Sequence, residues 1–267
     1  MKYYETHNEE YRRRLASGQV AWDEGKYDQF DMLGLIERFI RESNFEPSQS
    51  NALDLGCGTG GLACYLASRG FKVTAIDISS TAILEAKKQA ASRGLKINFR
   101  AADLCCEQLP KSAFDIITDN HFLHCIVFSN ERQTVLQNIS RALKPHGEYW
   151  IETMVGHPAM KPRNEWHLDA DGISWAAISR NVKVEGCVER DGRVLCPIRR
   201  IQPSEAILIE ELQRAGFEVA WHEITPPMNE NDTGTFRAKC RLITPDSVLR
   251  MITLQITEPH WIKGDPR

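Results

Sequence analysis

Residues 51–70, NALDLGCGTGGLACYLASRG, decide the fold. The short apolar run Asn51–Leu55 predicts a strand, and the pattern from Gly60 to Ser68 predicts a helix. Gly56 and Gly58 stand between them. A strand that turns directly into a helix needs backbone angles that side chains forbid, and a ligand over the turn needs Cβ atoms out of its way. Because the helix N-terminus also offers free N–H groups to an anionic ligand group, we expect this loop to bind a ligand.

Strand and helix patterns alternate around this stretch. The alternation indicates an α/β fold, a doubly wound parallel sheet covered by helices on both faces. Strands are predicted at Asn51–Leu55, Lys72–Asp77, Lys96–Ala101, Phe114–Asp119 and Glu148–Met154. Helices are predicted at Gln29–Ser43, Gly60–Ser68, Ser79–Gly94 and Glu131–Leu143, with Ser79 as an N-terminal cap.

The last quarter of the chain has a different pattern. Ser204–Ala215 predicts a helix, and the segments Glu218–Ile224 and Phe236–Leu242 predict strands. The loop between these strands is polar and rich in Pro and Gly, so we expect the two strands to pair antiparallel.

Residues 157–203 do not continue the alternation. Asp191-Gly192 is a two-residue turn signal between strand-like runs, which predicts a hairpin. A segment this long after the fifth strand suits a lid over a site at the carboxyl edge of the sheet, and a structural extension is the alternative. The hairpin register places Cys187 opposite Cys196, either as small packing residues or as a redox-sensitive or metal-binding pair.

These patterns predict one domain, residues 1–267, with five parts. They are an N-terminal helical cap (1–46), a ligand-binding core (47–156), the lid insertion (157–203), a helix with a strand pair (204–242) and a tail (243–267).

Composition excludes several classes of protein. The 33 basic and 36 acidic residues give a net charge of −3, which argues against nucleic acid as the main partner. No stretch reaches the 18 or more apolar residues that a spanning helix needs, and no apolar signal segment begins the chain, so we expect no membrane partner and a cytoplasmic location. The eight cysteines are expected to be reduced, and because none shows paired zinc spacing we expect no metal site.

The glycines alone leave two cofactor classes open, because Gly56, Gly58 and Gly61 also satisfy the G-x-G-x-x-G pattern of dinucleotide-binding folds. Asp54 precedes the first glycine, where a carboxylate is awkward beside a pyrophosphate but suits a cationic amino group. Asp77 ends the second strand, where a carboxylate can accept two hydrogen bonds from ribose hydroxyls. With no second catalytic domain after the sheet, a sulfonium nucleoside fits better than a dinucleotide.

Separated motifs between about residues 50 and 155 resemble the class I S-adenosylmethionine-dependent methyltransferases. They are DLGCGTG (54–60), AIDIS (75–79), AADL (101–104), FDIITDNHFLHCI (114–126) and ISRALKPHGEYWI (139–151). The resemblance implies a seven-stranded sheet, which agrees with the antiparallel pair predicted near the C-terminus. It also implies S-adenosylmethionine as the cofactor.

The resemblance further implies cofactor-binding roles. The methionine part of the cofactor would be held by Asp54, Gly56, Cys57, Gly58 and Gly60. The ribose would be bound by Asp77, and the adenine by Ile78, Asp103 and the Leu104 backbone. The sulfonium end would lie beside Asp119. For Asp77 the alternative is a helix cap, and for Asp103 it is a turn former.

Candidate catalytic residues follow the fourth strand, where the family places groups near the transferred methyl. His121 and His124 are the best candidates for a general base, and packed histidines are the alternative. Glu152 and His157 are weaker candidates.

Acceptor contacts are expected from the N-terminal segment and the lid. Trp22, Trp166 and Trp175 could stack on a planar or cationic molecule, and Arg199 or Arg200 could bind a carboxylate. We therefore expect a small-molecule methyltransferase. The alternatives are a protein or RNA methyltransferase, a non-catalytic S-adenosylmethionine-binding regulator and, third, a dinucleotide oxidoreductase.

Overall fold

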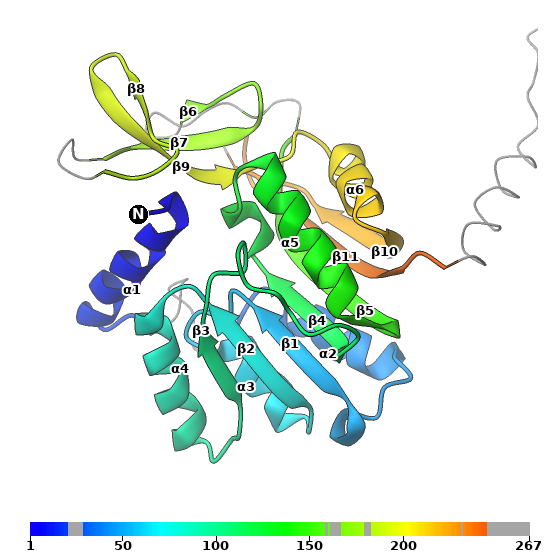
Figure 1. Cartoon of the computed structure of the whole chain (residues 1–267). Helices are drawn as coiled ribbons and strands as arrows, with labels where there is room; N and C mark the ends of the chain where they lie inside the picture. Colours follow the sequence, from blue (N-terminus) through cyan, green and yellow to red (C-terminus); the bar gives the residue numbers. More distant parts are fainter. Residues whose placement is uncertain (21–28, 158–159, 161–166, 179–182, 231, 245–267) are drawn as a thin grey trace, which may run out of the picture.

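A seven-stranded sheet forms the centre of the protein in the computed structural model, which describes residues 1–20, 29–157, 160, 167–178, 183–230 and 232–244 (Figure 1). Its strand order is β3-β2-β1-β4-β5-β11-β10. The first five strands in the chain pair in parallel, and β11 is antiparallel to both β5 and β10. The expected fold class is confirmed. The strands are β1 (Asn51–Leu55), β2 (Lys72–Asp77), β3 (Asn98–Ala101), β4 (Phe114–Asn120), β5 (Leu143–Val155), β10 (Phe217–Thr225) and β11 (Gly234–Leu242).

Helices cover both faces of this sheet. On one face α2 (Leu33–Glu42), α3 (Gly61–Ser68) and α4 (Ser80–Ser92) share a core with alternate strand residues such as Ala52 and Ile116. On the other face α5 (Ser129–Ala142) and α6 (Glu205–Arg214) pack against the intervening residues, such as Leu53 and Ile117. This alternation explains why central strands such as β1 and β4 are apolar at successive positions, because they are buried on both sides.

A second sheet lies beyond the carboxyl ends of the central strands (Figure 1). Its order is β6-β7-β9-β8, with β6 (His167–Leu168), β7 (Ile173–Ile178), β8 (Val188–Arg190) and β9 (Arg193–Arg200). The predicted hairpin is present, because Arg190 pairs with Arg193 and both turn residues, Asp191 and Gly192, have positive φ. The second sheet lies within the predicted insertion, residues 157–203, but β6 and β7 extend the predicted hairpin into four strands. Cys187 and Cys196 are both free thiols.

The N-terminal helix α1 (Thr6–Ala16) lies between this second sheet and α4 (Figure 1). It is fixed at the start of α4, where Asn8 Oδ1 accepts hydrogen bonds from Ser79 Oγ at 2.8 Å and from the Thr81 N–H at 3.1 Å. Ser79 caps α4 as predicted, accepting from the N–H of Ala82. The first helix therefore packs where the second strand ends. Among the described helices, none is long and apolar enough to cross a membrane.

Candidate functional site

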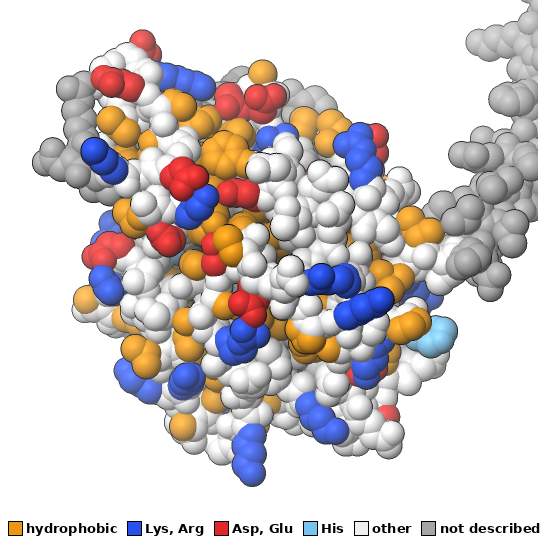
Figure 2. All heavy atoms as spheres, viewed as in Figure 1, with side chains coloured by type: hydrophobic (Ala, Val, Ile, Leu, Met, Phe, Trp, Pro, Cys, Tyr) orange, Lys and Arg blue, Asp and Glu red, His pale blue; other side chains and the backbone are white. Residues whose placement is uncertain are grey.

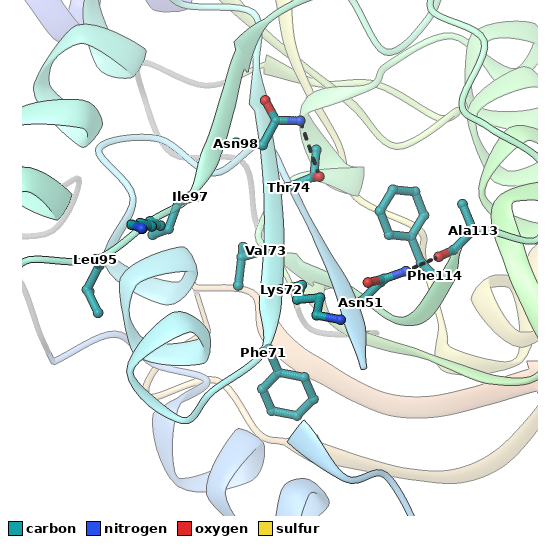
Figure 3. A pocket seen from close by; sticks show the side chains of 11 residues that line it. Asn51, Phe71, Lys72, Val73, Thr74, Leu95, Ile97, Asn98, Ala113 and Phe114 are labelled. Carbon is teal, nitrogen blue, oxygen red and sulfur yellow. Dashed lines mark hydrogen bonds between the residues drawn. The ribbon is translucent and has the colours of Figure 1, made fainter. Parts of the chain in front are cut away.

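A cavity of about 1430 Å³ lies at the carboxyl edge of the central sheet. Its walls come from α1, the glycine loop after β1, the segments after β2, β3 and β4, and the second sheet. A smaller hollow of about 780 Å³ lies at the opposite edge, where Asn51, Lys72, Asn98 and Phe114 begin β1 to β4 (Figure 3). Most of the predicted cofactor-binding residues, together with His121, His124 and Arg199, lie at the larger cavity, where an open α/β sheet commonly binds its ligand.

The glycine loop lines the cavity through Gly56, Cys57 and Gly58. Gly56 and Gly58 have φ values of 59° and 53°. A Cβ atom on Gly58 would lie 2.6 Å from the hydroxyl of Tyr11, so this close approach requires glycine.

Gly60 has a different role from its neighbours. It caps α3 with φ of 88°, and it is not among the residues that line the cavity. A Cβ atom there would lie 3.0 Å from Ala86 Cβ and 3.2 Å from the ring of Phe99. Because Gly60 has no Cβ atom, α3 can approach α4 and the sheet. The direct cofactor contact expected of Gly60 therefore becomes a packing role.

Asp54, at 2 % exposure, is among the residues that line the cavity. Thr118 donates to its Oδ1 at 3.0 Å, whereas Oδ2 has no hydrogen bond of normal geometry within the described residues, although the N–H of Ala63 faces the carboxylate. Burial, followed by the nearby charges of Asp119 and Asp77, raises the pKa of Asp54 to about 7. A cation bound beside Oδ2 would relieve this cost.

Asp77 ends β2 at the cavity wall. Its Oδ2 accepts the N–H of Gly58 and its Oδ1 accepts the N–H of Ser79, each at 2.8 Å. Burial raises the pKa of Asp77, while these two N–H groups and His7 oppose the rise. The carboxylate thus braces the glycine loop, and it keeps lone pairs for further donors because each oxygen accepts one of these bonds.

Asp103, Ile78 and Leu104 also line the cavity. The N–H of Cys105 donates to Asp103 Oδ1 at 2.9 Å, the pattern of a turn former. The hydroxyl of Tyr4 donates to Asp103 Oδ2 at 2.9 Å. The N-terminal segment therefore engages the carboxylate that was expected to accept from an adenine amino group.

Asp119 lies behind the cavity wall, since it is fully buried and is not among the lining residues. Its carboxylate accepts from the N–H groups of Phe122 and Leu123 and from the hydroxyl of Tyr149. Burial raises its pKa to about 6. Asp119 thus supports the turn after β4 that carries the two candidate histidines, instead of lining the cavity at the predicted sulfonium end.

Many residues of the N-terminal segment line the cavity but were assigned no role from the sequence, and four of them share a spacing. They are Tyr4, His7, Tyr11 and Arg14. Their spacing of three and four residues places them on one helical face. That periodicity was visible in the sequence and was a usable signal.

His121 lies between two carboxylates. Its Nε2 is 3.0 Å from Glu152 Oε1 and 3.4 Å from Asp31 Oδ2. Burial acts to lower the pKa of His121, but the two carboxylates outweigh it and raise the pKa to about 9. The residue has φ of 67°, an uncommon backbone conformation for a side chain of this size.

His124 is buried, lines the cavity and lies with its ring centroid 5.4 Å from that of His121. Burial and then the charge of His121 lower the pKa of His124 well below its ordinary value. Its Nδ1 lies 3.4 Å from Thr153 Oγ1. The two predicted catalytic histidines are therefore adjacent but differ in protonation at neutral pH.

The expected acceptor contacts separate in the structure. Arg199 lines the cavity from β9. His157 instead contacts the carbonyl of Asp232 at 3.0 Å, and Trp175 packs in the second sheet with its Nε1 donating to Asp169. The described residues that line the cavity do not include His157, Trp175 or Arg200. Trp22 and Trp166 lie outside the described residues.

The sequence matches a family model described as a methyltransferase domain over residues 52–147. It is 32% identical over 145 residues to an uncharacterized methyltransferase of Mycobacterium bovis, a match that covers 54% of this chain and 68% of that protein. It is 31% identical over 132 residues to a ubiquinone biosynthesis O-methyltransferase of Coxiella burnetii, which covers 49% of this chain and 54% of that protein.

Solved structures share the fold at lower identity. One is the 1,6-didemethyltoxoflavin-N1-methyltransferase of Burkholderia thailandensis with bound 1,6-didemethyltoxoflavin and S-adenosylhomocysteine. It matches with a TM-score of 0.59 at 18% identity and covers 89% of this chain and 87% of that chain. A SAM-dependent methyltransferase of Methanosarcina mazei matches with a TM-score of 0.60 at 22% identity and covers 79% of this chain and 98% of that chain.

Proposed function

The chain belongs to the class I methyltransferase family, and we propose that it transfers a methyl group from S-adenosylmethionine to a small-molecule acceptor. The observation that carries the cofactor assignment is Asp54, a buried carboxylate residue among those that line the cavity, whose Oδ2 forms no hydrogen bond of normal geometry with the described residues. A cationic amino group is the ligand group that this oxygen suits.

The remaining residues of the cavity fit the same cofactor. Asp77 can accept ribose hydroxyls with the lone pairs that Gly58 and Ser79 leave available. Ile78 and Leu104 supply apolar surface for the adenine, and Asp103 supplies an acceptor beside them. When bound, S-adenosylmethionine supplies an electrophilic methyl group.

The chain's own contribution is alignment and exclusion of water. Tyr3 donates to Glu131 at 2.7 Å and accepts the N–H of Val127 at 2.7 Å, so the N-terminal segment is fastened to the turn after β4. Tyr3 and Tyr4 also share an apolar cluster with Leu195 and Trp175 of the second sheet. These contacts close the cavity over the glycine loop. The catalytic roles of His121 and His124 remain predictions.

A small acceptor fits this enclosure better than a macromolecule. The cavity is covered by α1 and by the second sheet, and its volume suits a nucleoside cofactor together with a small organic molecule. On the face shown in Figure 2, basic and acidic side chains are interspersed, which favours a small molecule over a nucleic acid. Arg199 gives the acceptor end a positive charge, and we propose that it contacts an anionic group of the acceptor.

Incubation with S-adenosylmethionine labelled in its methyl group and a metabolite extract tests the proposal. Label should pass to small molecules with the wild-type chain and not with Asp54→Asn. Transfer to protein or RNA would overturn the acceptor class. If the cofactor binds but no label moves to any fraction, the chain is a binding regulator and not an active transferase.

A further inference from the structure

Three potential metal ligands from separate parts of the chain meet beside the cavity. Asp31 precedes α2, His121 follows β4, and Glu152 lies in β5. One donor atom from each residue lies within 4.8 Å of the other two. Asp31 and His121 line the cavity, and the cofactor assignment above uses none of the three.

Two of the separations between these atoms match those that a metal ion imposes on its ligands. His121 Nε2 is 3.0 Å from Glu152 Oε1 and 3.4 Å from Asp31 Oδ2. With metal–ligand bonds of about 2.1 Å, neighbouring ligands lie about 3.0 Å apart in an octahedral site and about 3.4 Å apart in a tetrahedral one. A single cation could therefore contact all three residues after small side-chain movements.

The Glu152 side chain is a second observation. It is 0 % exposed, and its Oε1 lies 3.0 Å from His121 Nε2 but has no hydrogen bond of normal geometry among the described residues. Arg237 binds the other oxygen, Oε2, and thereby holds Oε1 toward His121. The N–H of His121 also donates to the carbonyl of Glu152 at 2.8 Å, which fixes the two backbones together. Ligating carboxylates are commonly oriented by such additional hydrogen bonds.

We propose that Asp31, His121 and Glu152 bind a divalent first-row transition cation such as Mn²⁺, Co²⁺ or Zn²⁺. One imidazole and two carboxylates suit such cations, and three protein ligands leave coordination positions for water or an oxygen of a bound molecule. Glu152 already pairs with Arg237 through Oε2, and Arg237 also lies 3.7 Å from Glu223, so the cation adds charge balance chiefly for Asp31. Cysteine spacing gave no sign of this site because it contains no cysteine.

Titration of the untagged, metal-stripped chain with Co²⁺ tests the proposal, because bound Co²⁺ is followed by its visible absorption. We expect saturable binding of a single Co²⁺ per chain and its displacement by Zn²⁺. Absence of saturation up to about 1 mM Co²⁺ would overturn the proposal.

Variants locate the site. Asp31→Asn, His121→Ala and Glu152→Gln should each weaken Co²⁺ binding by about tenfold or more. The matched control is Glu148→Gln, which changes a similarly buried carboxylate of β5 that pairs with Arg241 at 2.7 Å, and it should leave binding unchanged. Asp31 has a side chain that is 63% exposed, so Asp31→Asn keeps the test valid if Glu152→Gln does not fold.

Unchanged Co²⁺ binding in Asp31→Asn and His121→Ala would place the cation elsewhere and overturn the assignment. S-adenosylhomocysteine binding is measured on the same samples. If that nucleoside binds and Co²⁺ does not, the metal site fails while the proposed function stands. If Co²⁺ binds and the nucleoside does not, the proposed function fails while the metal site stands.

Discussion

Thr118 on β4 donates its hydroxyl to Oδ1 of Asp54 on β1 at 3.0 Å, and the parallel register of the two strands sets these residues side by side. The hydrogen bond fixes one oxygen of this cavity-lining carboxylate, while Oδ2 has no hydrogen bond of normal geometry among the described residues. Strand pairing, and not a flexible loop, therefore positions the group that we assign to the cationic end of the cofactor.

Binding of S-adenosylhomocysteine should depend on the ionisation of Asp54. The pKa of about 7 lies above the ordinary value, so the empty site is largely protonated below that pH and must lose its proton to pair with an ammonium group. Affinity should therefore rise between about pH 6 and pH 7.5, with a smaller contribution from Asp119, whose pKa is about 6. Isothermal titration calorimetry at several pH values measures this.

The variant Asp54→Asn should weaken binding by about tenfold or more, because a charged hydrogen-bond partner is lost, and should flatten the pH dependence. Asp171→Asn, at an exposed position of the second sheet's turn, is the control and should behave as wild type. Equal affinity in Asp54→Asn and wild type would remove the carboxylate from the cofactor site.

The hydroxyl of Tyr4 competes for Asp103 Oδ2. Tyr4→Phe should therefore tighten binding of S-adenosylhomocysteine by about fivefold, the equivalent of one hydrogen bond of about 1 kcal/mol. Tyr65→Phe is the matched control, since its hydroxyl contacts Glu37 at 3.1 Å and Tyr65 is not among the residues that line the cavity. Weaker binding in Tyr4→Phe than in Tyr65→Phe would show that Tyr4 helps to hold the cofactor.

The features that local chemistry determines could be predicted from the sequence. The strand, glycine loop and helix around Asp54 have a signature in consecutive residues, and so does the Asp191-Gly192 turn, whose two residues need positive φ. Ser79 was identified as a cap for the same reason. These predictions needed no knowledge of which distant segments pack together.

The features that depend on distant pairing could not be predicted in this way. The contact between Tyr4 and Asp103 joins the N-terminus to the segment after β3, and the His121–Glu152 contact depends on the pairing of β4 with β5. β7 of the second sheet pairs with β9, and no turn motif in the sequence predicts this pairing. In each case the deciding information is tertiary packing.

Arg132 ties the turn after β4 to α6. Its side chain is 1% exposed and donates to the carboxylate of Glu211 and to the carbonyls of Leu123 and Ile126. Arg132→Ala should lower the free energy of unfolding by about 3 kcal/mol or more, because Glu211 is left charged and largely buried. Urea denaturation measures this change. Arg214→Ala removes an exposed ion pair with Glu210 and should cost less than about 1 kcal/mol; similar losses in both variants would contradict the structural role of Arg132.

Gly172 joins the turn before β7 to β9. Its φ is 76°, its carbonyl accepts the N–H of Ile201, and a Cβ atom would lie 2.2 Å from the carbonyl oxygen of Ile201. Gly172→Ala should therefore destabilise the second sheet and expose it to limited proteolysis. Gly94→Ala has similar backbone strain of about 1–2 kcal/mol but no close contact, so it should leave the cleavage pattern unchanged. Identical patterns in both variants would mean that the second sheet tolerates the change.

The central claim is that the cavity beside Asp54 binds an S-adenosyl nucleoside. Thermal melting of the wild-type chain with saturating S-adenosylhomocysteine, compared with NADH, tests it most directly. The account predicts a rise of about 5 °C with S-adenosylhomocysteine at a hundredfold excess over its Kd, and no rise with NADH. A melting temperature that is unmoved by S-adenosylhomocysteine but raised by NADH would contradict it.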